Sequence, residues 1–160
     1  GLSLAFVGDG NNIAGSLALA CAYSGMDFRI ASPEKYQLKP EIWNEANKLA
    51  NSNNTKMKWS SNIQEIVCDA DIVYTDVWIS MGDEEEKEER LSTFSSYQVN
   101  EKVISYAKSD CLFMHDMPAH RGEEISENML NHPNSVVYQQ AENRLHAQKA
   151  VIRNIFESNH

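Results

Sequence analysis

Short apolar runs alternate with amphipathic stretches along the whole chain. The apolar runs predict six strands, at residues 2–7, 28–31, 55–59, 71–75, 111–114 and 135–138. The amphipathic stretches predict helices from about residue 12 to 24, from 40 to 49, from 62 to 67, from 100 to 107, from 124 to 130 and from 141 to 155. Strict alternation of strand and helix indicates one α/β domain over residues 1–160. We expect a doubly wound, Rossmann-like parallel sheet with helices on both faces.

Local signals support several of these boundaries. Gly25 stands where the first helix should end, and Pro40 suits the first turn of the second. Asn62 followed by Glu65 has the form of a capping box. The chain shows no internal repeat and no low-complexity linker, so a single domain is expected.

Composition narrows the class of partner. The formal net charge of -9 argues against a nucleic acid or an anionic membrane surface. No apolar run approaches the roughly 18 residues of a membrane span. The three cysteines, Cys21, Cys68 and Cys111, lack the spacing of a zinc site, so no metal is expected. We expect them to be buried free thiols of a protein in a reducing compartment.

Polar residues follow the ends of four predicted strands. In an open parallel sheet, ligands bind beyond these carboxyl ends, so the polar residues should share one edge. The four groups are residues 8–12, residues 76–81, residues 115–121 and residues 139–144. They combine carboxylate, amide, hydroxyl and guanidinium groups, which suit a small zwitterion better than an apolar ligand.

The turn Gly8-Asp9-Gly10 also raises a dinucleotide-binding alternative. A nicotinamide site of the G-x-G-x-x-G type would have its third glycine at position 13, which is Ile13. The acidic residue expected after the second strand is missing as well, because Ser32 occupies that region. Both departures count against an oxidoreductase, and the glycines are equally explained by a tight strand-to-helix turn.

Six segments in order resemble ornithine carbamoyltransferases over nearly the whole chain. The segments are residues 8–12, 76–82, 88–91, 97–100, 115–124 and 141–144. The most specific is Asp76-Val77-Trp78-Ile79-Ser80-Met81-Gly82, since other carbamoyltransferases differ there. The resemblance implies the carboxyl-terminal, ornithine-binding domain of such an enzyme.

The resemblance also implies roles for individual residues. Asn12 would bind the α-carboxylate of ornithine, and Asp76 would pair with its α-ammonium group. Ser80 and Met81 would complete this clamp with hydroxyl and backbone groups, and Arg144 would reach the carbamoyl phosphate. The charges fit, because a zwitterion requires an anion for its ammonium group and donors for its carboxylate.

Each of these residues also has a purely structural interpretation. Asp76 is a possible loop cap, Asn12 a possible helix N-cap, and Arg144 a possible surface ion-pair partner. The acidic run from Asp83 to Arg90 is expected to be a solvated face.

One motif departs from the family. Where family members have His-Cys-Leu-Pro, this chain has His115-Asp116-Met117-Pro118. The family cysteine lies between the two substrates, and the next residue acts through its backbone, so Asp116 and Met117 are the corresponding candidates here. A carboxylate can accept a proton from the attacking amine, and it can also repel the phosphate.

The resemblance implies transfer of a carbamoyl group from carbamoyl phosphate to the δ-amine of ornithine, giving citrulline, without metal or organic cofactor. The chain lacks the Ser-x-Arg-Thr and His-Pro-x-x-Gln segments that the family uses for carbamoyl phosphate, so an amino-terminal domain is expected to be missing. Family members are usually homotrimers, cytoplasmic in bacteria and mitochondrial in many eukaryotes. A non-catalytic amino-acid-binding module, or an enzyme for putrescine or lysine, remains an alternative.

Overall fold

The computed structural model describes residues 1–80 and 82–158. Within them lies a five-stranded parallel sheet in the order β3-β2-β1-β4-β5. Its strands are β1 (Ser3–Val7), β2 (Asp27–Ala31), β3 (Met57–Ser60), β4 (Ile72–Thr75) and β5 (Leu112–His115). The doubly wound α/β prediction is confirmed, with five strands in place of six.

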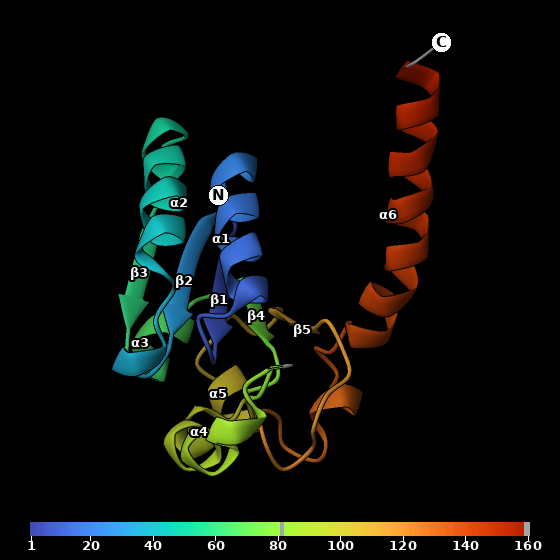
Figure 1. The fold of residues 1–160 in the computed structure, drawn as a ribbon. Helices are drawn as coiled ribbons and strands as arrows, with labels where there is room; N and C mark the ends of the chain where they lie inside the picture. The colour runs from blue at the N-terminus through green and yellow to red at the C-terminus, as the bar shows by residue number, and fades with distance from the viewer. Residues whose placement is uncertain (81, 159–160) are drawn as a thin grey trace.

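Helices cover both faces of the sheet (Figure 1). The α-helices are α1 (Asn12–Ser24), α2 (Pro40–Ser52), α3 (Ile63–Val67), α4 (Lys87–Phe94), α5 (Glu101–Ile104) and α6 (Val137–Ser158). Short 3-10 turns lie at η1 (Glu34–Tyr36), η2 (Glu84–Glu86), η3 (Ser95–Tyr97) and η4 (Met129–Asn131). The helix predicted at 100–107 is shorter than expected, and regular α-helix runs only from Glu101 to Ile104.

Strand β1 shows why both faces are apolar. Successive side chains of a strand point to opposite faces. Leu4 and Phe6 therefore pack with α1 and α2 in one cluster, while Ala5 and Val7 pack with α3, α4 and α5 in the other. All five residues of β1 are buried, which explains its continuous apolar run.

Asparagine side chains begin three of the helices. Asn11, Asn62 and Asn100 each accept hydrogen bonds from backbone N–H groups in the first turn of α1, α3 and α5. The capping box at α3 is only half formed. Asn62 accepts from the Glu65 N–H, but the Glu65 carboxylate accepts from the Ser60 hydroxyl instead of the Asn62 backbone.

The predicted sixth strand at 135–138 is wrong. Ser135 makes only an isolated bridge to Phe113, and Val137 already begins α6. The Val136 N–H donates to the Phe113 carbonyl, so the apolar run starts as a strand and turns into a helix after one pairing. The polar residues 139–144 therefore come from the first turns of α6.

The predicted helix at 124–130 is also wrong. Glu124 is fully buried, its backbone carbonyl accepts from the Val99 N–H, and Ile125 forms isolated bridges to Val99 and Arg121. Only Met129–Asn131 closes a 3-10 turn. These tertiary hydrogen bonds replace those that a helix would make.

Helix α6 extends away from the sheet (Figure 1). Val137 is its only buried residue among those described.

Among the described residues, none of the helices combines the length and the hydropathy that a membrane span requires. Of the three free cysteines, Cys21 and Cys111 are buried as expected, whereas Cys68 is exposed.

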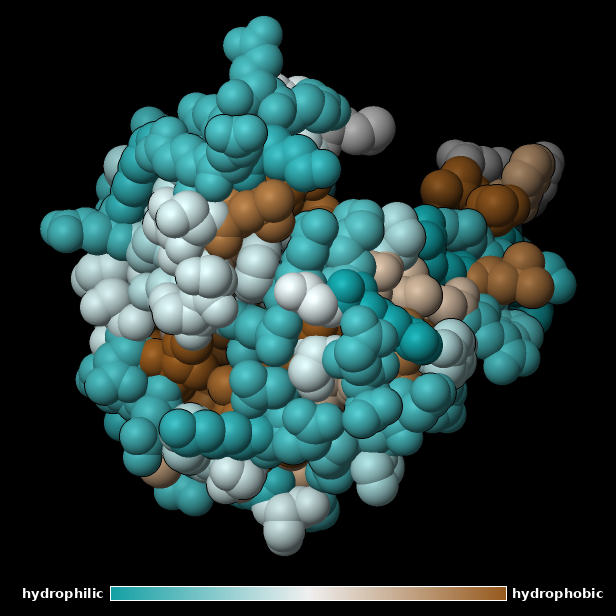
Figure 2. All heavy atoms as spheres, turned by 90° about the horizontal axis from the view of Figure 1, so that it is seen from below, coloured by the Kyte–Doolittle hydropathy of each residue, from teal (hydrophilic) through white to brown (hydrophobic). Residues whose placement is uncertain are grey.

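The strand order positions the candidate site. The chain starts at β1, moves outward to β2 and β3, and then returns to β4 on the other side of β1. The connections leaving β1 and β4 therefore run in opposite directions, which opens a crevice beyond their carboxyl ends. Figure 2 views the molecule from this side, and its surface there is mostly hydrophilic.

Candidate functional site

The turn after β1 is held tightly against its neighbours. The Gly10 N–H donates to the Tyr36 carbonyl, and a Cβ atom built at Gly10 would lie 2.3 Å from the Gln37 carbonyl carbon. Gly10 therefore permits close packing of two backbone segments. This explains the glycine in the turn without any dinucleotide.

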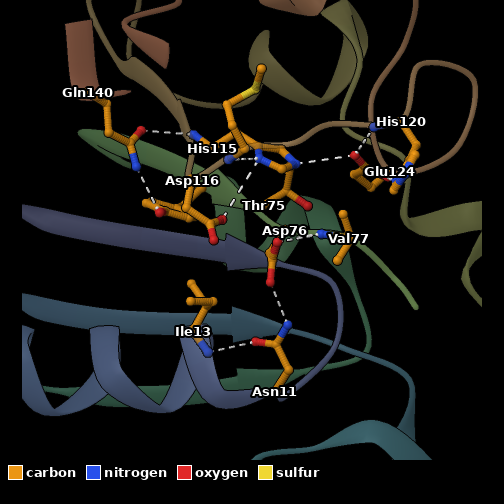
Figure 3. A network of polar contacts seen from close by, with 12 residues as sticks. Asn11, Ile13, Thr75, Asp76, Val77, His115, Asp116, His120, Glu124 and Gln140 are labelled. Carbon is orange, nitrogen blue, oxygen red and sulfur yellow. Dashed lines mark hydrogen bonds and ion pairs between the residues drawn. The ribbon is translucent and has the colours of Figure 1, made fainter. Parts of the chain in front are cut away.

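Asn11 connects this turn to the loop after β4. Its side-chain oxygen accepts from the N–H groups of Ile13 and Ala14, while its amide nitrogen donates to Asp76 Oδ2 at 2.7 Å (Figure 3). The N-cap of α1 is thus Asn11 and not Asn12. Sequence reasoning missed Asn11, although its place before a helix is the usual signal for a cap.

Asp76 follows β4 directly and is 7% exposed. Its Oδ1 accepts from the Val77 N–H at 2.7 Å, and its Oδ2 accepts from Asn11. These bonds fix the carboxylate, and each oxygen keeps a second lone pair. The loop-capping interpretation of Asp76 is therefore compatible with a role in binding a cation.

Asn12 and Ser80 line one hollow of about 730 Å³ beside the two turns. Asn12 is exposed at the start of α1, where the N–H groups of the first turn favour an anion. Ser80 is partly buried in the loop after β4. Met81 lies outside the described residues.

The end of β5 contributes a buried histidine. His115 Nε2 lies 3.2 Å from Glu124 Oε1, and its Nδ1 accepts from the Met117 N–H at 2.9 Å. Because Nδ1 accepts, Nε2 carries the proton and donates to Glu124. Both side chains are fully buried, so this pair fixes the loop that carries Asp116 and Met117 (Figure 3).

Asp116 lies next to Asp76 in the crevice. Burial, and then the nearby Asp76 carboxylate, raise the pKa of Asp116 to about 6. Its Oδ1 is buried and has no hydrogen-bond partner among the described residues. A carboxylate with an unused acceptor and a raised pKa is suited to receive a proton near neutral pH.

Tyr74 and Arg144 extend this charged neighbourhood. The Tyr74 hydroxyl accepts from Gln140 Nε2 at 2.8 Å, which joins β4 to the first turn of α6. Burial and the charge of Asp116 raise the pKa of Tyr74, and the positive charge of Arg144 opposes this shift. Arg144 is exposed on α6. Met117 is half-buried, with φ of 61°.

Three possible metal ligands meet in this crevice. Ligand atoms of Asp76, His115 and Asp116 lie within 4.8 Å of one another. The His115 ring already uses both nitrogens, one toward Met117 and one toward Glu124. Two carboxylates without a free imidazole suit an ammonium group better than a transition metal.

Arg90 is the side chain whose surroundings differ most from expectation. The run from Asp83 to Arg90 was expected to be solvated, but Arg90 is 7% exposed and lies among carboxylates. The charge pattern of the run gave no sign of this, because the burial depends on Asp9, far away in the sequence.

Comparisons with known proteins give one consistent family. Residues 1–155 match the family model described as aspartate/ornithine carbamoyltransferase, Asp/Orn binding domain. An ornithine carbamoyltransferase from Methanosphaera stadtmanae is 48% identical over 96% of the chain and 51% of its own length. One from Bacillus subtilis is 46% identical over 97% of the chain and 49% of its own length.

Solved structures agree. The ornithine carbamoyltransferase from Pyrococcus furiosus has a TM-score of 0.90 at 46% identity, covering 95% of this chain and 49% of that one. An anabolic ornithine carbamoyltransferase from Campylobacter jejuni has a TM-score of 0.92 at 36% identity, covering 97% and 51%. The chain thus spans about half the length of the relatives it matches. It belongs to the aspartate/ornithine carbamoyltransferase family, and the part of that family it represents is the Asp/Orn binding domain.

Proposed function

We propose that this chain is the ornithine-binding domain of an enzyme that carbamoylates the δ-amine of ornithine. The observation that carries the proposal is the pair of neighbouring carboxylates, Asp76 and Asp116, beyond the ends of β4 and β5 in a chain of this family. Asn11 links Asp76 to the turn after β1, where Asn12 lines a hollow together with Ser80. The relatives named as ornithine carbamoyltransferases support the choice of amino acid.

The clamp would hold the amino-acid end of ornithine. Asn12, at the positive end of α1, binds the α-carboxylate, and Asp76 pairs with the α-ammonium group. Ser80 and Met81 complete the clamp. Asp76 is suited to this because the Asn11 and Val77 contacts fix its carboxylate before the ligand arrives.

Asp116 would serve the reacting end. Its carboxylate takes one proton from the δ-ammonium group, which leaves a neutral amine with a free electron pair. The amine nitrogen attacks the carbonyl carbon of carbamoyl phosphate, the new C–N bond forms, and the C–O bond to phosphate breaks. As the intermediate collapses, the second amine proton passes to the departing phosphate, and the products are citrulline and hydrogen phosphate.

Met117 and Arg144 would face the second substrate. The Met117 backbone is fixed by the bond from its N–H to His115, which suits a residue that acts through its main chain. Arg144, exposed on α6, offers a guanidinium group to the phosphate. No metal or organic cofactor enters the proposed reaction.

A second domain, amino-terminal to this one, would bind the carbamoyl phosphate. The relatives are about twice as long as this chain, which leaves room for such a domain. Helix α6 supports the idea, because it exposes large apolar side chains at Tyr138, Leu145, Val151, Ile152 and Phe156. A homotrimer, a cytoplasmic or mitochondrial location and a role in arginine biosynthesis rest on the family resemblance alone.

A different amine or a non-catalytic role is the second candidate. The observation that favours this candidate is the presence of Asp116 where the family has cysteine. A carboxylate at this position would repel the phosphate group of carbamoyl phosphate.

Steady-state assays on the natural full-length protein test the proposal. Ornithine, putrescine and lysine would each be supplied with carbamoyl phosphate, and phosphate release and the carbamoylated product measured. We expect the highest kcat/KM with ornithine. Preference for another amine would favour the second candidate, and no turnover with any amine would favour a binding module.

A further inference from the structure

Arg90 is a buried cation that the proposed reaction does not use. It lies in the middle of α4, in a run rich in acidic residues, and its side chain is 9% exposed. Burying a guanidinium group costs several kcal/mol unless it is paired, so its partners indicate what it holds together.

The guanidinium group contacts four groups from three segments. Nη1 donates to Asp9 Oδ2 at 2.7 Å and to the Trp78 carbonyl at 3.0 Å. Nη2 lies 3.1 Å from Asp83 Oδ2. Nε lies 3.3 Å from Glu86 Oε2 but makes no aligned hydrogen bond.

An aromatic ring completes the surroundings. The guanidinium carbon lies 4.8 Å from the centre of the Tyr36 ring, in cation–π geometry. Tyr36 belongs to the segment whose carbonyl accepts from the Gly10 N–H. Arg90 therefore contacts the turn after β1, the loop after β4 and the segment that packs on Gly10.

The two connected segments carry the proposed ornithine contacts. Asp9 precedes Asn12 by three residues in the turn after β1, and Trp78 and Asp83 flank Ser80 in the loop after β4. Arg90, Asp9 and Asp83 line the same hollow as Asn12 and Ser80. A shift in the Arg90 contacts would therefore change the distance between the two sides of the clamp.

We propose that Arg90 is a positioning residue that sets the spacing between Asn12 and Ser80 and so determines the affinity for the amino-acid substrate. The inference rests on the proposed function, because it assumes that these residues bind ornithine. It requires the planar, multi-donor guanidinium group, since a lysine ammonium cannot reach Asp9, Trp78 and Asp83 together.

The test compares variants of the full-length protein in steady-state kinetics. Arg90→Lys keeps the charge and loses the planar, multi-donor group. Asp83→Asn weakens one contact at a carboxylate that is 32% exposed, whereas Asp9 is 10% exposed. Glu89→Gln is the matched control, because it neutralises an acidic residue of the same helix in an exposed ion pair with Lys35.

We expect KM for ornithine to rise about ten-fold or more in Arg90→Lys and about three-fold in Asp83→Asn, as lost charge-assisted contacts imply. The KM for carbamoyl phosphate, kcat and the thermal midpoint should stay close to wild type in Asp83→Asn, and Glu89→Gln should match wild type throughout. Arg90→Lys need not fold for the test to decide, since Asp83→Asn gives an independent result.

Two results would overturn the inference. One is an unchanged ornithine KM in either folded variant. The other is a fall in kcat accompanied by rises of similar size in both KM values and by a lower thermal midpoint. That pattern would make Arg90 merely structural. If the wild-type protein makes no citrulline, the proposed function fails first, and the two failures are thereby distinguished.

Discussion

At the residue scale, the crevice contains two carboxylates that differ in how completely they are paired. Asp76 has a hydrogen-bond partner on each oxygen, whereas the buried Asp116 Oδ1 has none among the described residues, and its nearest ring nitrogen, His115 Nδ1, is 3.8 Å away. The folded protein therefore holds Asp76 in place and leaves Asp116 with unused capacity to accept a proton.

Asp76→Asn should weaken ornithine binding in the full-length protein. The change removes one charge-assisted contact to the α-ammonium group, which costs about 1.5–3 kcal/mol, or about ten- to a hundred-fold in affinity. Competition by ornithine analogues, or KM for ornithine, measures this. Wild-type affinity in a folded variant would assign Asp76 a structural role only.

Asp116→Asn should lower turnover and raise stability. An amide keeps the shape but cannot take the proton, so kcat should fall more than ornithine affinity. The pKa of Asp116 is raised to about 6, so the folded state holds this proton more tightly than the unfolded state does. The wild type therefore loses stability as pH rises from about 4 through 6, and the amide does not.

The expected gain for Asp116→Asn at pH 7 is about 1–3 kcal/mol, and it should vanish below about pH 4. Denaturant unfolding of both proteins at pH 4 and pH 7 measures the difference. A variant that is no more stable at pH 7 than wild type would show that the carboxylate is not desolvated.

The residues named from the sequence are those that the resemblance assigns to a ligand, and those that were missed act through other side chains of the fold. Asp76 and Asp116 follow strands, where polar side chains are informative. Asn11 and Arg90 were missed because their importance depends on Asp76 and Asp9, which are far from them in the sequence. Glu124 was missed because its segment was predicted to be a helix, whereas it is a loop that brings Glu124 back to His115.

At the scale of elements, periodicity predicted the buried strands and the long helices, and it failed where tertiary contacts replace local ones. Strand β1 and helix α1 match their predicted ranges closely. Residues 124–130 have helical spacing, yet the Glu124 carbonyl accepts from the Val99 N–H and the Ile125 carbonyl accepts from the Gly122 N–H. Local propensity cannot anticipate such partners.

The close approach at Gly10 gives an element-scale prediction. In Gly10→Ala the new methyl group would overlap the Gln37 backbone, so we expect a loss of at least about 3 kcal/mol in the free energy of unfolding, or failure to fold. Gly25→Ala is the control, since φ is 75° there but no atom lies within 4 Å of the added Cβ. It should cost only about 1–2 kcal/mol. Equal effects in chemical denaturation would contradict the packing argument.

At the scale of the whole molecule, two features stand out: the carboxyl edge of the sheet, where polar side chains gather, and helix α6, which is almost entirely exposed. The edge carries the proposed ornithine contacts, beyond the ends of β1 and β4, and α6 extends away from the sheet with Arg144 in its first half (Figure 1). The relatives are about twice as long as this chain, and the match covers about half of each relative. We therefore expect the chain to hold one substrate and to depend on a second domain for the other.

The most direct test is to measure citrulline formation by residues 1–160 and by the natural full-length protein side by side. Circular dichroism and thermal unfolding of residues 1–160 would first establish that they fold. We predict a cooperatively folded domain without activity, and citrulline formation from ornithine and carbamoyl phosphate by the full-length protein. Citrulline formation by residues 1–160 alone at an enzymatic rate, or none by the full-length protein, would contradict the account.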